Sequence, residues 1–193
     1  PFLKKGLFSF RENMHRYILT GAPGCGKTSI IRALEIQGYF VIDEAATDII
    51  AYEQLMECSE PWKNPSFIDG ITNLQKQRQV QVGGCKDSYQ FFDRSPICTY
   101  ALCIFLGFDP SLSLKEEIKR MQDHKIYEST VFFIENLGFI ENTDARQISF
   151  EEALRFENIH KEAYALFGYE CVKIPKSNLI DRVKKILKLV SED

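Results

Sequence analysis

An eight-residue segment near the start of the chain constrains the fold more than any other feature of the sequence. It reads Gly21-Ala22-Pro23-Gly24-Cys25-Gly26-Lys27-Thr28 and satisfies G-x-x-x-x-G-K-[ST] at every fixed position. An apolar strand is expected before it and a helix after it, so backbone N–H groups and a helix N-terminus would surround one concavity. Glycines suit this loop because the chain must approach phosphates closely in conformations that cost other residues energy. The segment predicts a binding site for ATP or a close relative of it.

The same loop assigns roles to single side chains. Lys27 would reach the β- and γ-phosphates, the Thr28 hydroxyl would bind Mg²⁺, and the nucleotide-binding segment is expected to extend to Ser29. Cys25 has two interpretations, an oxidation-sensitive thiol or a small residue that serves only the turn. ATP and Mg²⁺ are therefore the expected cofactors.

From Arg16 onward, short apolar runs alternate with longer amphipathic stretches, a pattern typical of a parallel α/β sheet. Strands are expected at residues 17–20, 39–42, 89–92, 130–134 and 170–174. A helix is expected over 27–37, and another begins at Ser149, whose spacing to Glu152 matches a capping box. The last helix carries an apolar stripe and has Ser177 as its expected cap. Residues 61–65 are expected to form a loop between two helical stretches, and 98–108 a buried helix.

Two short polar segments follow expected strands. Asp93, in the triplet Asp93-Arg94-Ser95, would hold the water shell of Mg²⁺ or else cap the next helix. Arg94 would neutralise a phosphate or bind the acceptor, or form an ordinary ion pair. Asp43 and Glu44 follow the second strand, at the sheet edge where ligands of open α/β folds bind. Either carboxylate could take a proton from a substrate hydroxyl or bind a sugar, although acids in a first helical turn are also favoured by the helix dipole alone.

The composition of the chain limits the classes of partner that the protein is expected to bind. The 193 residues carry a formal charge of −3 with acidic and basic side chains interspersed, which argues against nucleic acid and membrane partners. Six cysteines are scattered without a C-x-x-C pair, as expected in a reducing cytosol. Residues 1–13 are expected to be an N-terminal tail or an expression remnant, and 14–193 a single domain. The sequence makes no prediction of an oligomeric state.

The loop, the segment Val41-Ile42-Asp43-Glu44-Ala45-Ala46, the triplet at Asp93 and the stretch 130–175 together resemble the small AAA-domain ATPases related to ribosylnicotinamide kinase. The triplet is also similar to the Asp/Glu-Arg pairs of deoxynucleoside and thymidylate kinases. That resemblance implies a P-loop NTPase fold with a five-stranded parallel sheet, strand order 2-3-1-4-5, flanking helices and a lid that supplies arginines to the phosphates. The lid would occupy 138–149 and contain Arg146, although Asp144-Ala145-Arg146 is one residue shorter than the usual Asp-Gly-x-Arg. The resemblance also leads us to expect an arginine after the second strand, and this chain has Thr47 at that position.

Two function classes follow from these residues. The first is a kinase that moves the ATP γ-phosphoryl group to a small-molecule acceptor such as a nucleoside or nucleotide, with Lys27, Asp93, Arg94, Arg146 and Glu44 as the catalytic candidates. Helices between residues 45 and 84 would form the acceptor pocket. The alternative is an AAA-type ATPase or nucleotide-dependent switch that acts on a protein partner, with Asn136 as a sensor. A GTPase is disfavoured because the sequence has no [NT]-K-x-D motif.

Overall fold

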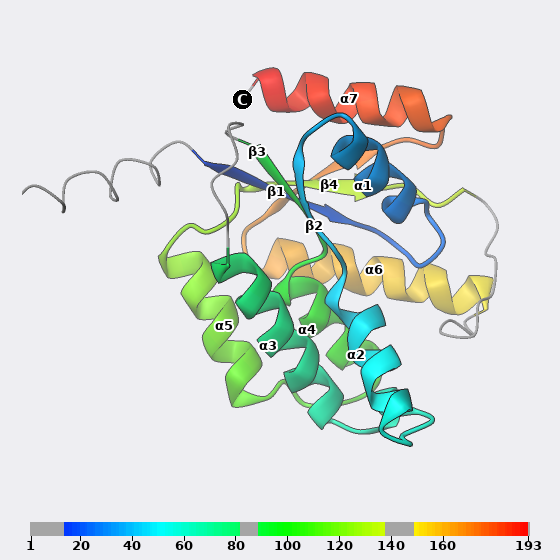
Figure 1. Cartoon of the computed structure of the whole chain (residues 1–193), viewed down its shortest axis with the longest axis vertical. Helices are drawn as coiled ribbons and strands as arrows, with labels where there is room; N and C mark the ends of the chain where they lie inside the picture. Colours follow the sequence, from blue (N-terminus) through cyan, green and yellow to red (C-terminus); the bar gives the residue numbers. More distant parts are fainter. Residues whose placement is uncertain (1–13, 82–88, 138–148, 193) are drawn as a thin grey trace, which may run out of the picture.

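Five parallel strands form one sheet in the order β2-β3-β1-β4-β5 (Figure 1). The computed structural model describes residues 14–81, 89–137 and 149–192. The strands are β1 (His15–Thr20), β2 (Phe40–Ile42), β3 (Tyr89–Asp93), β4 (Thr130–Ile134) and β5 (Glu170–Ile174). The predicted strands and their predicted order are both confirmed. The tail at 1–13 and most of the expected lid lie outside the described residues.

The central strand β1 is buried on both faces. Tyr17, Ile18 and Leu19 are all fully buried, and β1 pairs with β3 on one side and β4 on the other. The Tyr17 ring stacks on Phe91 of β3 and on Phe132 of β4, with ring centroids 6.1 Å and 5.4 Å apart. Such continuous apolar runs are typical of strands covered by helices on both faces.

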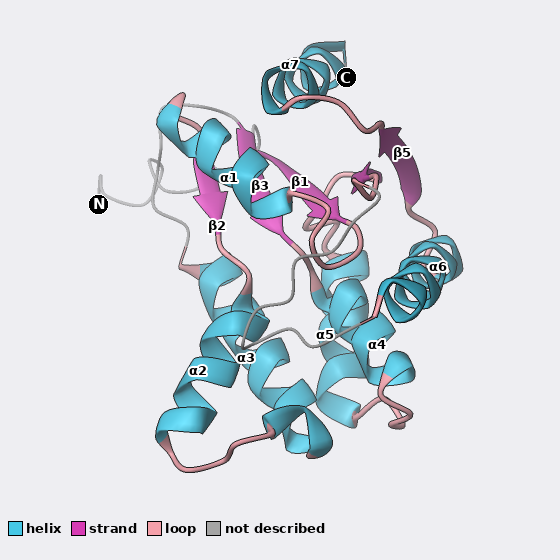
Figure 2. Ribbon diagram, turned by 90° about the vertical axis from the view of Figure 1, so that its right-hand side faces the viewer, coloured by secondary structure: helices cyan, strands magenta, loops and turns pink. Residues whose placement is uncertain are grey.

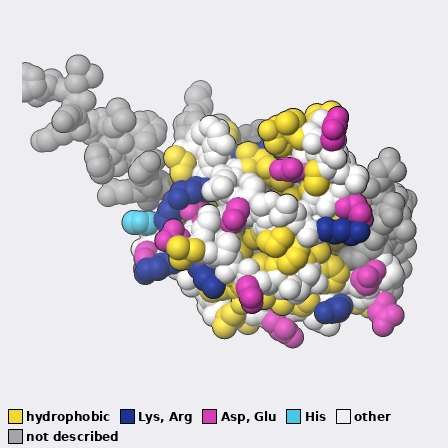
Figure 3. Space-filling view, turned by 90° about the horizontal axis from the view of Figure 1, so that it is seen from below, with side chains coloured by type: hydrophobic (Ala, Val, Ile, Leu, Met, Phe, Trp, Pro, Cys, Tyr) yellow, Lys and Arg dark blue, Asp and Glu magenta, His cyan; other side chains and the backbone are white. Residues whose placement is uncertain are grey.

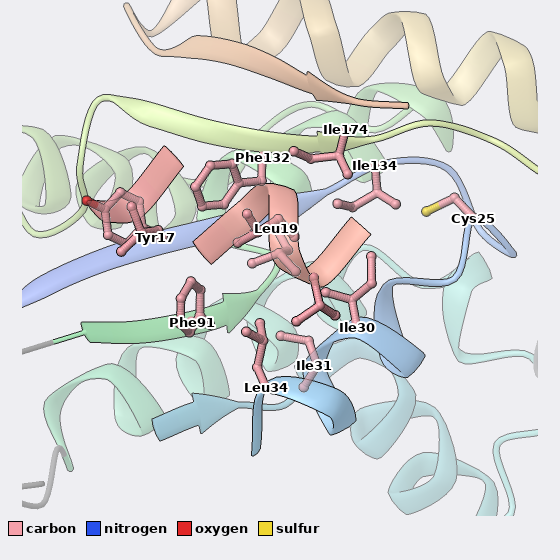
Figure 4. Packing of buried hydrophobic residues seen from close by; sticks show 13 residues of the cluster. Tyr17, Leu19, Cys25, Ile30, Ile31, Leu34, Phe91, Phe132, Ile134 and Ile174 are labelled. Atoms are coloured by element: carbon pink, nitrogen blue, oxygen red, sulfur yellow. The ribbon is translucent and has the colours of Figure 1, made fainter. Parts of the chain in front are cut away.

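One face of the sheet is covered by α1 (Lys27–Ile36) and α7 (Leu179–Glu192) (Figure 1). Figure 4 shows Ile30, Ile31 and Leu34 of α1 directed toward Leu19 and Phe91 of the sheet. Burial of each such side chain stabilises the fold by about 1.5–3 kcal/mol. This packing holds α1 against the sheet and so fixes the position of the loop that leads into it.

The opposite face is covered by α4 (Pro96–Phe105) and α6 (Phe150–Leu166), with α5 (Leu112–Asp123) packed against α4. The predicted buried helix at 98–108 therefore exists, but it begins at Pro96 because Ser95 caps it and ends before Gly107, whose φ is +78°. None of the described helices combines the length and the apolar character needed to cross a bilayer.

The remaining helices, α2 (Ala45–Leu55) and α3 (Ser66–Val80), extend below the carboxyl end of β2 (Figure 2). They are joined through a short 3₁₀ turn, η2 (Pro61–Lys63), within the segment predicted to be a loop. Phe67 and Ile71 of α3 pack on Ala45 of α2. Figure 3 shows that charged side chains of both signs are scattered over the face seen from below, around a central group of apolar ones.

Of the two predicted caps at helix N-termini, the cap of α6 is confirmed and the cap of α7 is wrong. The capping box at Ser149 is confirmed, with reciprocal hydrogen bonds between Ser149 and Glu152. The predicted cap at Ser177 is wrong. The Oδ1 atom of Asn178 accepts the backbone N–H of Asp181 at 2.9 Å, while the Ser177 hydroxyl only reaches the carbonyl of Asn178 at 3.5 Å. The backbone that leaves β5 places the later side chain at the start of α7.

We predict that Asn178→Ala lowers the free energy of unfolding by about 1 kcal/mol, because the Asp181 N–H loses its acceptor. Ser177→Ala is the matched control and should change stability by less than about 0.5 kcal/mol. Urea unfolding followed by circular dichroism measures both. A larger loss for Ser177→Ala would return the cap to that residue.

Candidate active site

The carboxyl ends of β1, β2 and β3 bring the predicted site residues to one edge of the sheet. The glycine-rich loop 21–28 follows β1, Glu44 follows β2, and Asp93 is the last residue of β3. Leu19 pairs with Asp93, and Ile42 pairs with Phe92, so the three strands end at nearly the same level. The edge therefore places the loop beside two carboxylates that are far apart in sequence and lie on the same side of β1.

Gly21 turns the chain out of β1 with a φ of +140°, where other residues are strained. A Cβ on Gly21 would lie 2.5 Å from the carbonyl oxygen of Ile134 at the end of β4, so a larger residue would separate the strands. Gly26, with a φ of +88°, begins α1, whose first turn holds Lys27. The first N–H groups of a helix have no acceptor within the helix, so this turn is suited to bind an anion.

Lys27 is 6% exposed, and its Nζ donates to the carbonyls of Gly21 and Ala22 at 3.1 Å each. Thr28 and Ser29, by contrast, are exposed at the mouth of the loop. Cys25 is fully buried within the core cluster beneath the loop. Its burial favours the interpretation of a small structural residue over that of an oxidation-sensitive thiol.

Asp93 is not the cap of α4. Ser95 takes that place, because its Oγ accepts the N–H of Ile97 at 3.3 Å and lies 2.9 Å from the Tyr164 hydroxyl. Asp93 is 6% exposed, and its Oδ1 has no hydrogen-bond partner among the described residues. Burial raises the pKa of Asp93 to about 6, against the nearby Lys27 ammonium, which lowers it. A buried, unpartnered carboxylate oxygen beside the loop is suited to a hydrated Mg²⁺.

Arg94 forms an ion pair with Glu44, whose Oε1 accepts from Nε at 2.5 Å. The backbone of Arg94 has a φ of +75°, which is uncommon for a residue with a side chain, and its N–H donates to the carbonyl of Leu19. Burial is the largest single effect and disfavours the charge, but the Glu44 carboxylate, together with Cys98, Asp93 and Cys25, raises the pKa of Arg94 above its ordinary value. The unusual backbone directs the guanidinium toward the loop that follows β2, so the two ends of the ion pair are held rigidly.

The two acidic candidates after β2 have different environments. Asp43 forms a surface ion pair with Arg32 of α1 at 3.2 Å. Glu44 is directed inward to Arg94, and its Oε2 also accepts from the Thr47 hydroxyl at 3.1 Å. Arg78 of α3 donates to the backbone carbonyls of both acids and fixes the turn between them. Glu44 is therefore the carboxylate that faces the site.

His160 of α6 completes the group and was missed by the sequence interpretation. Its Nε2 accepts from Nη1 of Arg94 at 3.1 Å, and its Nδ1 donates to the carbonyl of Phe156 at 2.8 Å. A carbonyl can only accept, so the proton of the neutral ring is on Nδ1. Burial, followed by the Arg94 charge, lowers the pKa of His160 to about 3. The sequence feature that could have identified His160 is its spacing, since it is a polar residue four positions after Phe156 and lies on the buried face of α6.

A cavity of about 570 Å³ opens beside the Glu44–Arg94 pair. It is bounded by Pro23 of the loop, by α2 and α3, and by α4 and Phe156 of α6. Aromatic rings and amide or hydroxyl groups share its lining, among them Trp62, Phe67, Phe105, Gln54, Gln75 and Thr99. The Thr99 hydroxyl donates to Oε1 of Gln75 at 2.8 Å, which orients that amide. Trp62 and Phe67 thus belong both to the core and to the cavity wall, whereas Tyr52 is exposed.

Arg146 lies outside the described residues. Arg155 of α6 is exposed, and its guanidinium carbon lies 5.8 Å from the centroid of the Phe105 ring, which lines the cavity.

We predict that His160 makes stability depend on pH with a defined sign. The unfolded chain binds a proton at the ordinary histidine pKa of 6.5, whereas folded His160 stays neutral down to about 3. Protons therefore favour the unfolded state, and stability falls as pH is lowered below about 6.5, at a rate approaching about 1.4 kcal/mol per pH unit from this one group.

Urea unfolding at pH 5, 6 and 7.5 checks this. His160→Gln should have a shallower dependence than the wild type, while His124→Gln, which removes an exposed ring at the end of α5, should leave the dependence unchanged. Equal slopes in all three proteins would mean that His160 is protonated in the fold.

Comparison with solved structures places this arrangement among P-loop kinase folds. The deoxyadenosine kinase of M. mycoides with dCMP and dCDP bound aligns with a TM-score of 0.60 and 13% identity over 92% of this chain and 98% of that one. NadR in complex with NR aligns with a TM-score of 0.65 and 16% identity over 93% of this chain, which spans only 50% of NadR. No curated protein matches the sequence.

The family comparison is more direct. A model described as AAA domain matches residues 16–182, which include the loop, Glu44, Asp93 and His160. That match covers most of the chain, and the protein therefore belongs to this AAA domain family, with a P-loop kinase-like fold.

Proposed function

We propose that the protein is an ATP-dependent kinase that transfers the γ-phosphoryl group to a small-molecule acceptor such as a nucleoside or nucleotide. The observation that carries this proposal is the position of the Glu44–Arg94 pair. It lines a cavity of about 570 Å³ whose wall includes Pro23 of the phosphate-binding loop. Acceptor and triphosphate sites would therefore adjoin, as direct transfer requires.

Residues of the loop would hold the triphosphate. Its backbone N–H groups and the start of α1 would bind phosphate oxygens, and Lys27 would exchange its two loop carbonyls for phosphate oxygens. Thr28 would contact Mg²⁺ directly, and Asp93 would hold it through water. When bound, Mg²⁺ supplies positive charge that offsets the negative charge of the phosphates.

Glu44 would be the general base. Its ion pair with Arg94 favours the ionised carboxylate, the form that accepts a proton. The acceptor hydroxyl oxygen would form a bond to the γ-phosphorus as the bond to the ADP oxygen breaks, and the hydroxyl proton would pass to Glu44. Arg94 would hold the carboxylate in place, and His160 would hold Arg94. Arg146 remains a predicted lid residue that would stabilise the transferring group.

The cavity lining suits a ring with polar edges. Trp62, Phe67 and Phe105 offer apolar surface, and the oriented amide of Gln75 offers hydrogen bonds. The solved neighbours agree with such an acceptor, since deoxyadenosine kinase is described with dCMP and NadR with NR. The alternative of a nucleotide-dependent switch draws on the family name, but it gives no role to the cavity that opens beside the loop. The expected cytosolic location stays a prediction from the sequence.

We predict that ADP release from Mg-ATP depends on an acceptor. A panel of nucleosides, nucleotides and vitamins should contain at least one compound that raises the rate about 100-fold or more above hydrolysis alone, because a bound acceptor replaces water in an oriented site. A coupled ADP assay measures the rates. Slow hydrolysis that no compound accelerates, but that a protein partner does, would establish the switch.

We predict that Glu44→Gln lowers kcat by about 100-fold or more while the affinity for ATP changes little, because the base is lost and the phosphate loop is not. Asp43→Asn is the matched control. It removes the neighbouring carboxylate from an exposed ion pair and should leave kcat within about twofold. Steady-state kinetics with the best acceptor tests both variants, and equal losses would rule out Glu44 as the base.

A further inference from the structure

Arg182 of α7 joins three loops at the carboxyl edge of the sheet. It is 3% exposed. Its Nη1 donates to the carbonyl of Cys25 in the phosphate loop at 2.7 Å, and its Nη2 to the carbonyl of Glu135 after β4 at 2.5 Å. Its Nε donates to the carbonyl of Pro175 after β5 at 3.3 Å. One side chain therefore fixes the ends of β1, β4 and β5 relative to each other.

The partners of Arg182 are neutral. Among the described residues its hydrogen bonds go to backbone carbonyls, while the Glu135 carboxylate is occupied by Lys173 and by the N–H of Lys176. Burial lowers the pKa of Arg182, opposed by the fields of Cys25 and Glu135. A buried cation without a bonded carboxylate is costly in a folded protein. The cost would be offset by an anion close by.

The guanidinium lies directly behind the phosphate loop. A Cβ built on Gly26 would be 3.0 Å from Nη1 of Arg182, and the same nitrogen donates to the Cys25 carbonyl, so this charge is in contact with the backbone of the loop. Gly26 is the first residue of the turn that begins α1. The positive charge thus adds to the field of the helix N-terminus at the place where phosphates would bind.

We propose that Arg182 is a positioning residue for nucleotide binding, which braces the phosphate loop from behind and supplies fixed positive charge to the phosphate site. It acts through the loop and does not touch the phosphates. This inference rests on the proposed nucleotide site, since the brace has no electrostatic purpose without a bound anion. The planar guanidinium group is essential, because a lysine ammonium carries the same charge but cannot donate to these three carbonyls in their three directions.

Isothermal titration calorimetry of Mg-ATP, ADP, AMP and inorganic tripolyphosphate tests the proposal with Arg182→Lys, Arg182→Met and wild-type protein. We expect Mg-ATP to bind about 10-fold more weakly to Arg182→Lys and about 100-fold more weakly to Arg182→Met, as for the loss of charge-assisted hydrogen bonds. For Arg182→Met the loss should decrease from tripolyphosphate and ATP to ADP to AMP. A purely structural role would weaken all four ligands by the same factor.

Lys185→Met is the control, because it removes the same charge from an exposed position of the same helix and should bind like the wild type. Circular dichroism below each melting temperature establishes that the variants are folded, and Arg182→Lys decides the outcome where Arg182→Met is too unstable. Wild-type affinities in folded Arg182→Lys, or equal losses for all ligands, would overturn the proposal. Absence of Mg-ATP and tripolyphosphate binding by the wild type would instead overturn the proposed function.

Discussion

The close passage of Gly21 against the carbonyl of Ile134 is the constraint on which the site depends. At this point the chain leaves the central strand with a backbone that only glycine adopts without strain, and there is no space for a side chain. The tight turn keeps the phosphate loop in contact with the sheet edge. Because β1 lies between β3 and β4, a loop at this position can meet side chains from both halves of the sheet. Asp93 and Glu44 come from one side, and the contacts of α7 come from the other.

The charges around the loop are arranged in two groups. In the first group, the charges of Glu44 and Arg94 cancel. His160 also accepts a hydrogen bond from Arg94 but is neutral, so Arg94 is oriented without a second negative charge. A carboxylate in place of His160 would leave a net negative charge beside a phosphate site. Lys27 of the loop and Arg182 behind the loop both donate to backbone carbonyls and not to carboxylates. An anion would therefore meet a positive loop next to a neutral acid–base pair.

The sequence predicted the strands well because their apolar runs are short, buried on both faces and separated by amphipathic helices. It placed Asp93 and Glu44 on one edge because parallel strands end together. It did not identify His160 or Arg182, because the contacts that bring them to the site, with Arg94 and with Cys25, span 66 and 157 residues of the chain, and no local pattern encodes such a distance. The cap of α7 was misplaced for a different reason: Ser177 and Asn178 are both good caps, and only the path of the chain after β5 selects the second.

The hydrogen bond between Arg182 and Cys25 also has a consequence during synthesis of the chain. It connects the loop after β1 to α7 across 157 residues, so it cannot form before residue 182 has been synthesised. Contacts of high sequence separation also carry a loop-closure entropy, which slows the folding of a chain that depends on them. While the chain is being translated, the phosphate loop would exist without its rear support. A nascent chain would then reach its full affinity for nucleotide only after α7 has packed with α1 in their common core cluster.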